Sequence, residues 1–498
     1  MDENISNSFY TDFYEFTMLQ SALVDGTAHK PATFELFGRK LPKGRRYGVV
    51  AGTQRAISAI ENFSFTEEQV SWLRANTALN DETLEYLENF SFTGTVTGLR
   101  EGDLYFPYDP VLSVESTFGE CVLLETVLLS IFNHDSAVAS AASRMVQAAR
   151  GVPIIEMGSR RTNEKAAPAA ARAAYLTGFT ATSNIAAAYD YGVPITGTSA
   201  HAFTLAHKEE QTAFRNQVEA LGESTTLLVD TYDIAEGIDN AIAAAGEKLG
   251  GVRIDSGDLY EETLKARKQL DAAGNTETKI VLSSDIDEFV IQELGERNIP
   301  VDGIGAGTKV VTGSGHPTAG MVYKLVEIDG RSVSKRSENK ISVGGTKKVY
   351  RDSANTFTDY IVVNGHDVSD DVRILESGII TRTFIKSGEV VFNPDLEESR
   401  EFHASVMGEL SETMKSVQAG EVAFRTEYIG SDVEPVANMS RPHSAQRQLS
   451  LLPTEREGEY KVSGIRRSAV TGRYITEKSL SEDSDGTGGT DDIADNDE

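Results

Sequence analysis

The sequence predicts an α/β fold: an irregular α/β barrel joined to an additional β-rich domain that the N-terminal and C-terminal segments build together. Between residues 152 and 308, short apolar runs end repeatedly in polar residues or glycines, as in TTLLVD and IVLSSD. A parallel strand is buried on both faces and therefore has a continuous apolar sequence. Helical patterns separate these runs, and about seven such units favour closure into a barrel over an open sheet.

The segments on either side of this stretch lack the repeat. Residues 34–42 and 94–116 alternate in hydrophobicity and carry Gly and Pro, which predicts strands and turns. Residues 66–90 predict two short helices, and residues 120–150 predict a long helix or a pair of helices. After residue 320, the runs MVYKLVEI, ISVGGTKKVY and DYIVV predict strands that complete the N-terminal sheet. We therefore expect an N-terminal region at 1–150, the barrel at 151–320, a C-terminal β-rich region at 321–478 and a tail at 479–498.

Two of the helices between the predicted strands have clear patterns. The run DIAEGIDNAIAAAGEKL places Ile234, Ile238 and Ile242 on one face at helical spacing. The run LYEETLKARKQLDAAG has acidic residues in its first turn, basic residues later and Gly274 as a stop. Both are expected to connect neighbouring parallel strands.

Composition limits the possible partners. The 498 residues include 47 basic and 76 acidic side chains, which gives a formal net charge of −29. Such a surface repels phosphate backbones, so we do not expect nucleic acid as a partner. The start of the chain has no signal-peptide pattern, and no apolar run approaches the ~20 residues that span a bilayer. We therefore expect a cytoplasmic protein that has no membrane partner and binds any anionic substrate in a local basic pocket.

Two further segments have simple interpretations. The single cysteine, Cys121, lies in the apolar run CVLLETVLLSIF and is expected in the core rather than in catalysis. Residues 479–498 are rich in Asp, Ser and Gly and poor in apolar side chains, so we expect disorder there.

The first candidate site residues follow two of the predicted strands. Arg160 and Arg161, in EMGSRRT, offer forked donors suited to phosphate or carboxylate, although a solvated arginine pair is the alternative. His201, in GTSAHAF, lies just after a strand end and could be a base, a ligand, a covalent nucleophile or a structural residue.

Asp230 and Asp255 end the next two predicted strands, in LLVDTYDI and VRIDSGDL. Neighbouring carboxylates at strand ends suit Mg²⁺ or sugar hydroxyls, while helix N-capping, which Asp233 and Ser256 could equally perform, is the structural alternative for each. Arg253 lies two residues before Asp255, so both side chains leave the strand on the same side. An Arg–Asp pair that points into a site is the interpretation we favour.

The last two strand ends are SSDIDEF and GIGAGTK. Glycine in such a loop lets backbone N–H groups approach a phosphate. The candidates here are Ser284, Asp285, Gly305, Gly307 and Thr308. From the residues alone, the set predicts a barrel enzyme that binds a small phosphorylated substrate with Mg²⁺.

The ordered set of motifs from Tyr10 to Arg351 resembles the nicotinate phosphoribosyltransferase family, of the type II phosphoribosyltransferases. The matching pieces are TDFYEFTM, FELFGRKLP, EGDLYFPYDPVLSVES, EMGSRRTNEKAA, GFTATSNIAAAYDYGVPITGTSAHAF, LLVDTYDI, GVRIDSGDL, IVLSSDIDEF and GIGAGTKVVTGSGHPTAGMVYKLVE. The resemblance implies that nicotinate displaces pyrophosphate from phosphoribosyl pyrophosphate to give nicotinate mononucleotide, which feeds NAD synthesis. It also implies Mg²⁺, ATP as a co-substrate, and a homodimer with shared active sites.

The resemblance assigns roles to the candidates. It makes His201 the residue that ATP phosphorylates transiently. It gives Arg160 and Arg161 to pyrophosphate, Arg253 to nicotinate or pyrophosphate, and Asp230 and Asp255 to the ribose hydroxyls or the metal. The loops at Ser284–Asp285 and Gly305–Thr308 would then hold the 5′-phosphate, and Tyr14 would stack on the pyridine ring from the neighbouring subunit.

Two positions bear on which pyridine binds. Met157 stands where the related nicotinamide enzymes carry a ring-stacking phenylalanine, and a thioether can contact a ring edge. The position of Ser183 matches approximately an aspartate of the nicotinamide enzymes. Serine removes a repulsion against a carboxylate, which favours nicotinate. The alternatives are a nicotinamide or quinolinate phosphoribosyltransferase, a metal-dependent barrel hydrolase built on His201, Asp230 and Asp255, and a non-catalytic nucleotide sensor.

Overall fold

A computed structural model describes residues 6–337, 340–431, 466–467 and 474–475. The chain forms two compact units, residues 1–440 and 441–498. In the second unit, the described residues are the antiparallel pair of β22 (Arg466–Arg467) and β23 (Tyr474–Ile475). The predicted tail at 479–498 lies outside the described residues, and the predicted region boundaries at 150, 320 and 478 stay predictions.

The first unit contains a seven-stranded antiparallel sheet that mixes both ends of the unit. Its order is β13, β12, β1, β5, β3, β19 and β20. The N-terminal strands are β1 (Pro31–Gly38), β3 (Thr95–Leu99) and β5 (Leu112–Thr117). The later strands are β12 (Met321–Ile328), β13 (Arg331–Ser332), β19 (Thr381–Lys386) and β20 (Glu389–Val390). The β1–β12 pair, with Leu36 opposite Tyr323, joins segments from the two ends, as predicted.

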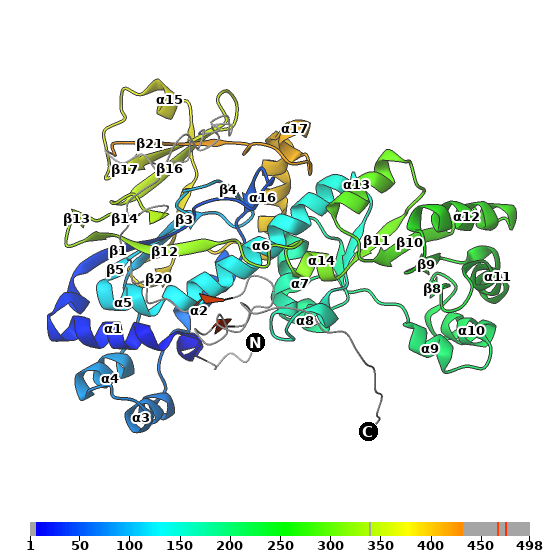
Figure 1. Cartoon of the computed structure of the whole chain (residues 1–498), viewed down its shortest axis with the longest axis horizontal. Helices are drawn as coiled ribbons and strands as arrows, with labels where there is room; N and C mark the ends of the chain where they lie inside the picture. Colours follow the sequence, from blue (N-terminus) through cyan, green and yellow to red (C-terminus); the bar gives the residue numbers. More distant parts are fainter. Residues whose placement is uncertain (1–5, 338–339, 432–465, 468–473, 476–498) are drawn as a thin grey trace, which may run out of the picture. The chain divides into compact units, whose positions relative to one another are not determined.

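Short helices pack on this sheet and close its core (Figure 1). α3 begins after a capping box in which Thr66 and Gln69 exchange hydrogen bonds, and α4 begins after Asn80, so the two predicted short helices are confirmed. Phe16, Phe63, Phe65 and Phe90 form a chain of edge-to-face contacts in this core. The helices are η1 (Asn7–Phe9), α1 (Phe13–Val24), η2 (Thr27–His29), α2 (Thr53–Glu61), α3 (Glu67–Asn76), α4 (Asp81–Glu88) and α5 (Phe118–Leu123).

Smaller sheets and the last helices complete this part of the unit. The four-stranded sheet has the order β18, β16, β17, β21, and buried Arg351 on β16 pairs with Asp103 and with Asp359. The elements are β2 (Gly48–Val49), β4 (Leu104–Tyr105), β14 (Arg336–Ser337), β15 (Lys340–Ile341), β16 (Lys347–Asp352), β17 (Thr358–Val363), α15 (Val372–Leu375), β18 (Gly378–Ile379), α16 (Leu396–Glu409), α17 (Glu412–Lys415) and β21 (Arg425–Ile429).

The middle of the chain forms a parallel sheet of six strands in the order β7, β6, β11, β10, β9, β8. The strands are β6 (Ile154–Glu156), β7 (Ala181–Thr182), β8 (Thr226–Leu228), β9 (Gly251–Ile254), β10 (Lys279–Ser284) and β11 (Gly303–Ala306). Their buried Ile, Val and Leu side chains form a second core cluster. The connections are η3 (Ser159–Arg161), α7 (Ala167–Leu176), α8 (Ile185–Tyr191), α9 (His201–Leu205), α10 (Glu210–Leu221), α11 (Ile234–Ala245), η4 (Gly246–Lys248), α12 (Leu259–Ala272), α13 (Glu288–Glu296) and α14 (Thr308–Val311).

This sheet is a half-barrel, which corrects the expectation of a closed barrel. Among the described residues, no hydrogen-bonded ladder joins β8 to β7. The segment beyond β7 pairs with it only at Ile195, in an isolated bridge to Thr182. Instead, Arg253 on β9, the neighbour of β8, donates from Nη1 to Oγ1 of Thr198, in the segment beyond β7, over 2.8 Å. The strand predicted to end near His201 is therefore mostly an extended segment.

α6 (Glu125–Ala149) is one helix of 25 residues that belongs to both parts of the unit (Figure 1). Near its first half, Asn133 accepts from the backbone N–H of Met321 on β12 over 2.8 Å. Near its end, Arg144 donates to Glu288 on α13 over 3.1 Å. With α5 before it, α6 confirms the predicted helix pair.

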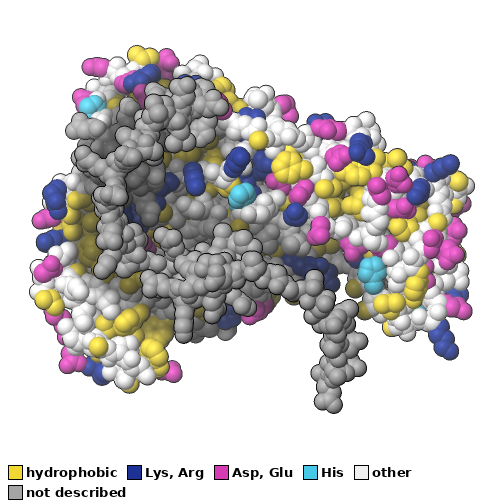
Figure 2. Space-filling model, in the orientation of Figure 1, with side chains coloured by type: hydrophobic (Ala, Val, Ile, Leu, Met, Phe, Trp, Pro, Cys, Tyr) yellow, Lys and Arg dark blue, Asp and Glu magenta, His cyan; other side chains and the backbone are white. Residues whose placement is uncertain are grey.

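Acidic and basic side chains are interspersed over the half-barrel on the face drawn in Figure 2. Among the residues that the structure describes, none of the helices combines the length and apolar character needed to cross a bilayer.

Candidate active site

The carboxyl ends of the six parallel strands lie along one edge of the half-barrel. Because the strands are all parallel, the residues that follow them meet there. This edge carries Met157 after β6, Ser183 after β7, Asp230 after β8, Asp255 after β9, Ser284 and Asp285 at the end of β10, and Gly305, Gly307 and Thr308 at the end of β11. The structure therefore brings together most of the residues that the sequence singled out.

His201 lies at the same edge, at the start of α9, with an intermediate exposure. Its Nδ1 is 3.2 Å from Oγ1 of Thr231, the residue after Asp230. Its Nε2 is 3.8 Å from Oδ1 of Asp230 and 4.0 Å from Oδ2 of Asp255. The imidazole thus faces two carboxylates and one hydroxyl.

Asp230 is the most buried of these groups, with a side chain that is 1% exposed. Its Oδ2 accepts from the backbone N–H of Asp255 over 3.0 Å and from the hydroxyl of Ser256 over 2.6 Å. Its Oδ1, the oxygen nearest His201, is buried without a hydrogen bond to any described residue. A buried carboxylate oxygen without a donor is costly, so it marks a position where a proton, a metal or a substrate hydroxyl would be bound favourably.

The helices that follow β8 and β9 are capped by residues other than Asp230 and Asp255. Asp233 caps α11, as that alternative expected, by accepting from the N–H of Glu236 over 3.0 Å. Asp258, rather than Ser256, caps α12 through the N–H groups of Tyr260 and Glu261. Asp230 and Asp255 cap neither helix, so both remain available to the site.

Arg253 points from β9 toward this group of carboxylates. Beyond its bond to Thr198, its Nε is buried without a partner among the described residues. Burial lowers the pKa of the Arg253 guanidinium, Asp255 and Asp230 oppose that shift, and Arg160 adds to it. Arg160 is therefore close enough to act on Arg253 electrostatically, and Arg160 and Arg161 are both exposed on the same short turn, η3.

Glu156 shapes the turn that carries the two arginines, a role that the sequence did not reveal. It is 1% exposed and accepts from the hydroxyl of Thr182 over 2.6 Å and from the N–H of Gly158. Burial raises the pKa of its carboxyl, while these two bonds lower it. A methyl group on Gly158 would lie 2.2 Å from Cγ1 of Val311, so this position requires glycine.

Met157 covers the end of β11. A methyl group at Gly305 would lie 2.7 Å from Sδ of Met157, so Gly305 must be glycine for the thioether to lie there. Gly307 has no such restriction, because its nearest neighbour would be the Met157 carbonyl oxygen at 3.4 Å. Ser183, Ser284 and Asp285 are exposed at the same edge.

Tyr14 is not part of this edge within the chain. It lies on α1, near the start of α6, whereas the strands of the half-barrel lie toward the other end of that helix (Figure 1). Its side chain is 46% exposed. Burial, followed by Glu125 and Glu15, raises the pKa of its phenol to about 12, and Thr126 lowers it. The chain does not bring Tyr14 to its own site.

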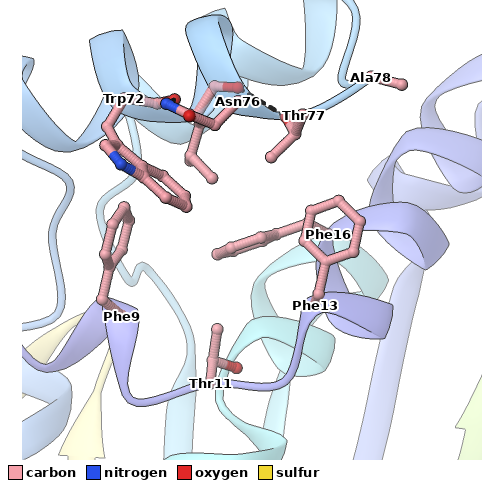
Figure 3. Close-up of a pocket in the computed structure, with 9 residues that line it drawn as sticks. Phe9, Thr11, Phe13, Phe16, Trp72, Asn76, Thr77 and Ala78 are labelled. Atoms are coloured by element: carbon pink, nitrogen blue, oxygen red, sulfur yellow. Dashed lines mark hydrogen bonds between the residues drawn. The ribbon is translucent and has the colours of Figure 1, made fainter.

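A separate pocket of about 620 Å³ lies beside α1 (Figure 3). Phe9, Phe13, Phe16 and Trp72 supply most of its aromatic wall, and Thr11 lies between the first two. None of the candidate site residues lines it, and its lining carries no charged side chain. Its chemistry is that of an apolar surface rather than a catalytic centre.

Asp230 and Asp255 are the candidate Mg²⁺ ligands at this edge. No three His, Cys, Asp or Glu side chains of the described part of the chain form a closed metal site. Mg²⁺ commonly keeps several waters and binds through one or two carboxylates together with substrate phosphates. The unpaired oxygen of Asp230 and the half-exposed carboxylate of Asp255 fit a metal that arrives with a phosphorylated substrate.

An open parallel sheet that carries basic and acidic side chains along its carboxyl edge is typical of α/β enzymes. Comparison with known proteins identifies the family within that class. The model of the nicotinate phosphoribosyltransferase N-terminal domain matches residues 9–133, and that of the nicotinate phosphoribosyltransferase family matches residues 152–360. The chain belongs to the nicotinate phosphoribosyltransferase family.

Individual relatives agree. The chain is 52% identical over 430 residues to the nicotinate phosphoribosyltransferase pncB1 of Mycobacterium tuberculosis, covering 84% of this chain and 94% of the relative. It is 38% identical over 386 residues to nicotinate phosphoribosyltransferase of Bacillus subtilis, covering 74% and 79%. The crystal structure of human nicotinic acid phosphoribosyltransferase superposes with a TM-score of 0.74 at 25% identity, covering 84% of this chain and 98% of that one.

Proposed function

We propose that this chain transfers the phosphoribosyl group of phosphoribosyl pyrophosphate to nicotinate. The products are nicotinate mononucleotide and pyrophosphate, as a step in NAD salvage. The observation that carries the proposal is family membership over both matched regions, together with the convergence of His201, Asp230, Asp255 and Arg253 at one edge.

Charge explains how the edge would act on phosphoribosyl pyrophosphate. Loss of pyrophosphate leaves positive charge on the ribose C1 carbon and negative charge on the leaving group. Arg160, Arg161 and Arg253 would hold the pyrophosphate, since guanidinium forks suit its oxygens. Asp255 and Asp230 would bind ribose hydroxyls or Mg²⁺, whose chemistry when bound is to neutralise the pyrophosphate. Catalysis is then mainly positioning and charge stabilisation.

The loops after β10 and β11 would take the 5′-phosphate. Ser284 pairs with Ala306 in the sheet, so the two loops start side by side. Gly307 is free of the packing that restricts Gly305, and this leaves its backbone accessible to a ligand. The residues concerned are Ser284, Asp285, Gly305, Gly307 and Thr308.

We further propose that ATP hydrolysis is coupled through His201. Asp230 Oδ1 would accept a hydrogen bond from Nε2–H, which leaves the lone pair on Nδ1 beside Thr231. Nδ1 attacks the γ-phosphorus of ATP, and the bond from that phosphorus to the ADP oxygen breaks. Water later hydrolyses the phosphohistidine to phosphate and free His201. Asp230 stabilises the positive charge that the ring gains in the first step.

Tyr14 would stack on the pyridine ring from a second copy of the chain, opposite Met157. The support is that Tyr14 lies far from the site of its own chain while its ring stays half-exposed. This arrangement requires a homodimer in which each site uses both chains.

The test is pyrophosphate release from phosphoribosyl pyrophosphate with nicotinate, nicotinamide or quinolinate, each with and without ATP. We expect release with nicotinate, stimulated by ATP, and ADP formed in proportion. Preference for another pyridine would replace the proposed substrate. Release without any ADP formation would overturn the coupling alone.

A further inference from the structure

Glu15, the residue after Tyr14, is a charged side chain with no exposed surface. Its Oε1 accepts from the backbone N–H of Thr126 over 2.9 Å and from the Thr126 hydroxyl over 2.5 Å. Its Oε2 accepts from the hydroxyl of Thr11. Three donors therefore converge on one carboxylate, two of them from the first turn of α6.

The same turn of α6 acts on Tyr14. The side chains of Thr126 and Glu125 lie against the phenol, where Glu125 raises its pKa and Thr126 lowers it. Glu125 is itself paired with Lys324 on β12, with 3.7 Å between Nζ and Oε1. Glu15 and Tyr14 thus share Thr126, and the position of Thr126 sets where the phenol can lie.

The charged form of Glu15 suits this arrangement best. A carboxylate accepts from all three donors as a charged acceptor, whereas a carboxylic acid or an amide is a weaker acceptor and carries hydrogen on one of its two polar atoms. The N-terminus of α6 also favours a negative charge. Charged or titratable groups that interact with Glu15 are Tyr14 from its own segment, Glu125 from α6 and Tyr323 from β12, while Asp12 and Lys324 act on Glu125.

We propose that Glu15 is a positioning residue for nicotinate binding: through Thr126, its carboxylate fixes Tyr14 in the orientation that stacks on the pyridine ring. The proposal rests on the role proposed above for Tyr14. It assigns a function to the second half of the motif TDFYEF, which the fold alone does not require to contain a buried acid.

Titration separates this role from a purely structural one. Burial raises the pKa of Glu15 to about 7, with Glu125 adding to the shift and the bonds from Thr11 and Thr126 opposing it. Glu15 is charged above that pH and neutral below it. Wild-type enzyme should therefore bind nicotinate well above pH 7 and resemble a neutral variant below it. Loss of a merely structural contact would change stability without producing this pH profile.

The experiment compares the KM for nicotinate of Glu15→Gln and wild type between about pH 5.5 and pH 8.5. We expect the ratio of the two KM values to reach about 10-fold at the upper end, from loss of hydrogen bonds to a charged group, and to fall to about 1 at the lower end. Using the ratio removes the titration of the substrates, which is common to both enzymes. The value of kcat should change much less than KM.

Glu120→Gln is the matched control. Glu120 is also buried and accepts from an N–H and two hydroxyls, those of Thr93 and Ser116, but it does not contact Tyr14. The ratio of the KM for nicotinate of Glu120→Gln to that of wild type should stay near 1 at every pH. Thr126→Val leaves Glu15 in place but removes one of its donors and should raise KM as well, so the test does not depend on one variant folding.

The possible results distinguish failure of this inference from failure of the role proposed for Tyr14. A ratio that is independent of pH, or a Glu15→Gln enzyme with wild-type KM, would overturn the inference while the proposed function stands. Wild-type KM in Tyr14→Ala would overturn the role of Tyr14, and the inference with it. In the Tyr14→Ala background, Glu15→Gln should have no further effect on KM; an additive effect would contradict the coupling.

Discussion

The imidazole of His201 faces the buried carboxylate of Asp230, with 3.8 Å between Nε2 and Oδ1. This oxygen has no other partner among the described residues, so the pair is the most specific electrostatic feature of the edge. Its consequences can be tested one residue at a time.

Replacing His201 with alanine should abolish nicotinate-dependent ATP hydrolysis, because it removes the proposed nucleophile. We expect a loss of at least about 1,000-fold in the rate of ADP formation. His207→Ala is the control, since that ring bonds to Asn216 and to the Phe203 carbonyl away from the carboxylates. Full ATP coupling in His201→Ala would exclude the phosphohistidine.

Substitutions of Asp230 and Asp233 should have different effects, the first mainly on activity and the second mainly on stability, although the two residues are only three positions apart. Asp230→Asn should lower kcat/KM by about 10- to 100-fold, because it weakens the orientation and charge of His201. Asp233→Ala removes only a helix cap and should cost about 1 kcal/mol of stability with little change in activity. Steady-state kinetics and thermal unfolding of both variants distinguish the two roles. Equal kinetic effects would contradict them.

A shared site predicts complementation between inactive variants. Tyr14→Ala and His201→Ala should each be poorly active alone. When their subunits are mixed and allowed to exchange, about a quarter of the sites should carry both wild-type residues. Recovered pyrophosphate release, together with a molar mass of two chains by light scattering, is the expected result. Mixing without any recovery would place Tyr14 outside the partner's site.

Ser183 tests the preference for a carboxylate over an amide. It is exposed after β7, beside the end of β6, since its N–H donates to the Glu156 carbonyl over 2.9 Å. Ser183→Asp should raise the KM for nicotinate far more than that for nicotinamide, because a second carboxylate would repel nicotinate. Equal effects on both pyridines would refute the selectivity argument.

His403 predicts how stability depends on pH. It is buried on α16, where Nδ1 donates to the Gly102 carbonyl over 2.8 Å and Nε2 accepts from Ser143 over 3.1 Å. Burial lowers its pKa from 6.5 to about 4. The neutral ring is preferred in the folded protein, so its contribution is complete above pH 6.5 and is lost as the pH falls toward 4. The loss amounts to about 3 kcal/mol.

Urea unfolding at several pH values measures this effect. His403→Gln, which cannot be protonated, should be less stable at neutral pH but should lose less stability between pH 6.5 and pH 4. If the free energy of unfolding falls equally steeply with pH in the variant and in wild type, another group causes the acid sensitivity.

The elements of the half-barrel could be predicted because buried parallel strands have a local signature. β8, β9 and β10 each end close to where an apolar run meets Asp or Ser. Closure could not be predicted in the same way. Arg253 on β9 bonds to Thr198 beyond β7 through its side chain, and no periodicity in the sequence records such a contact.

The site was predictable where chemistry and strand ends coincide, as at Asp230 and Asp255. Helix capping was harder, because α12 begins at Leu259 and so takes Asp258 rather than Ser256 as its cap. The contribution of Glu156 was hidden, since an acid at a strand end gives no sign that it will be buried against a turn. Tyr14 has no neighbour in sequence that links it to the site, and only the family resemblance did so.

The continuity of α6 also limits how the molecule can move. Its 25 residues extend about 37 Å as one uninterrupted rod, held to β12 through Asn133 and to α13 through Arg144. A hinge between the antiparallel sheet and the half-barrel would have to bend this rod, and α6 contains no proline or glycine at which bending is easy. Within one chain, substrates would therefore enter and leave through displacement of loops at the strand ends rather than through a hinge across α6.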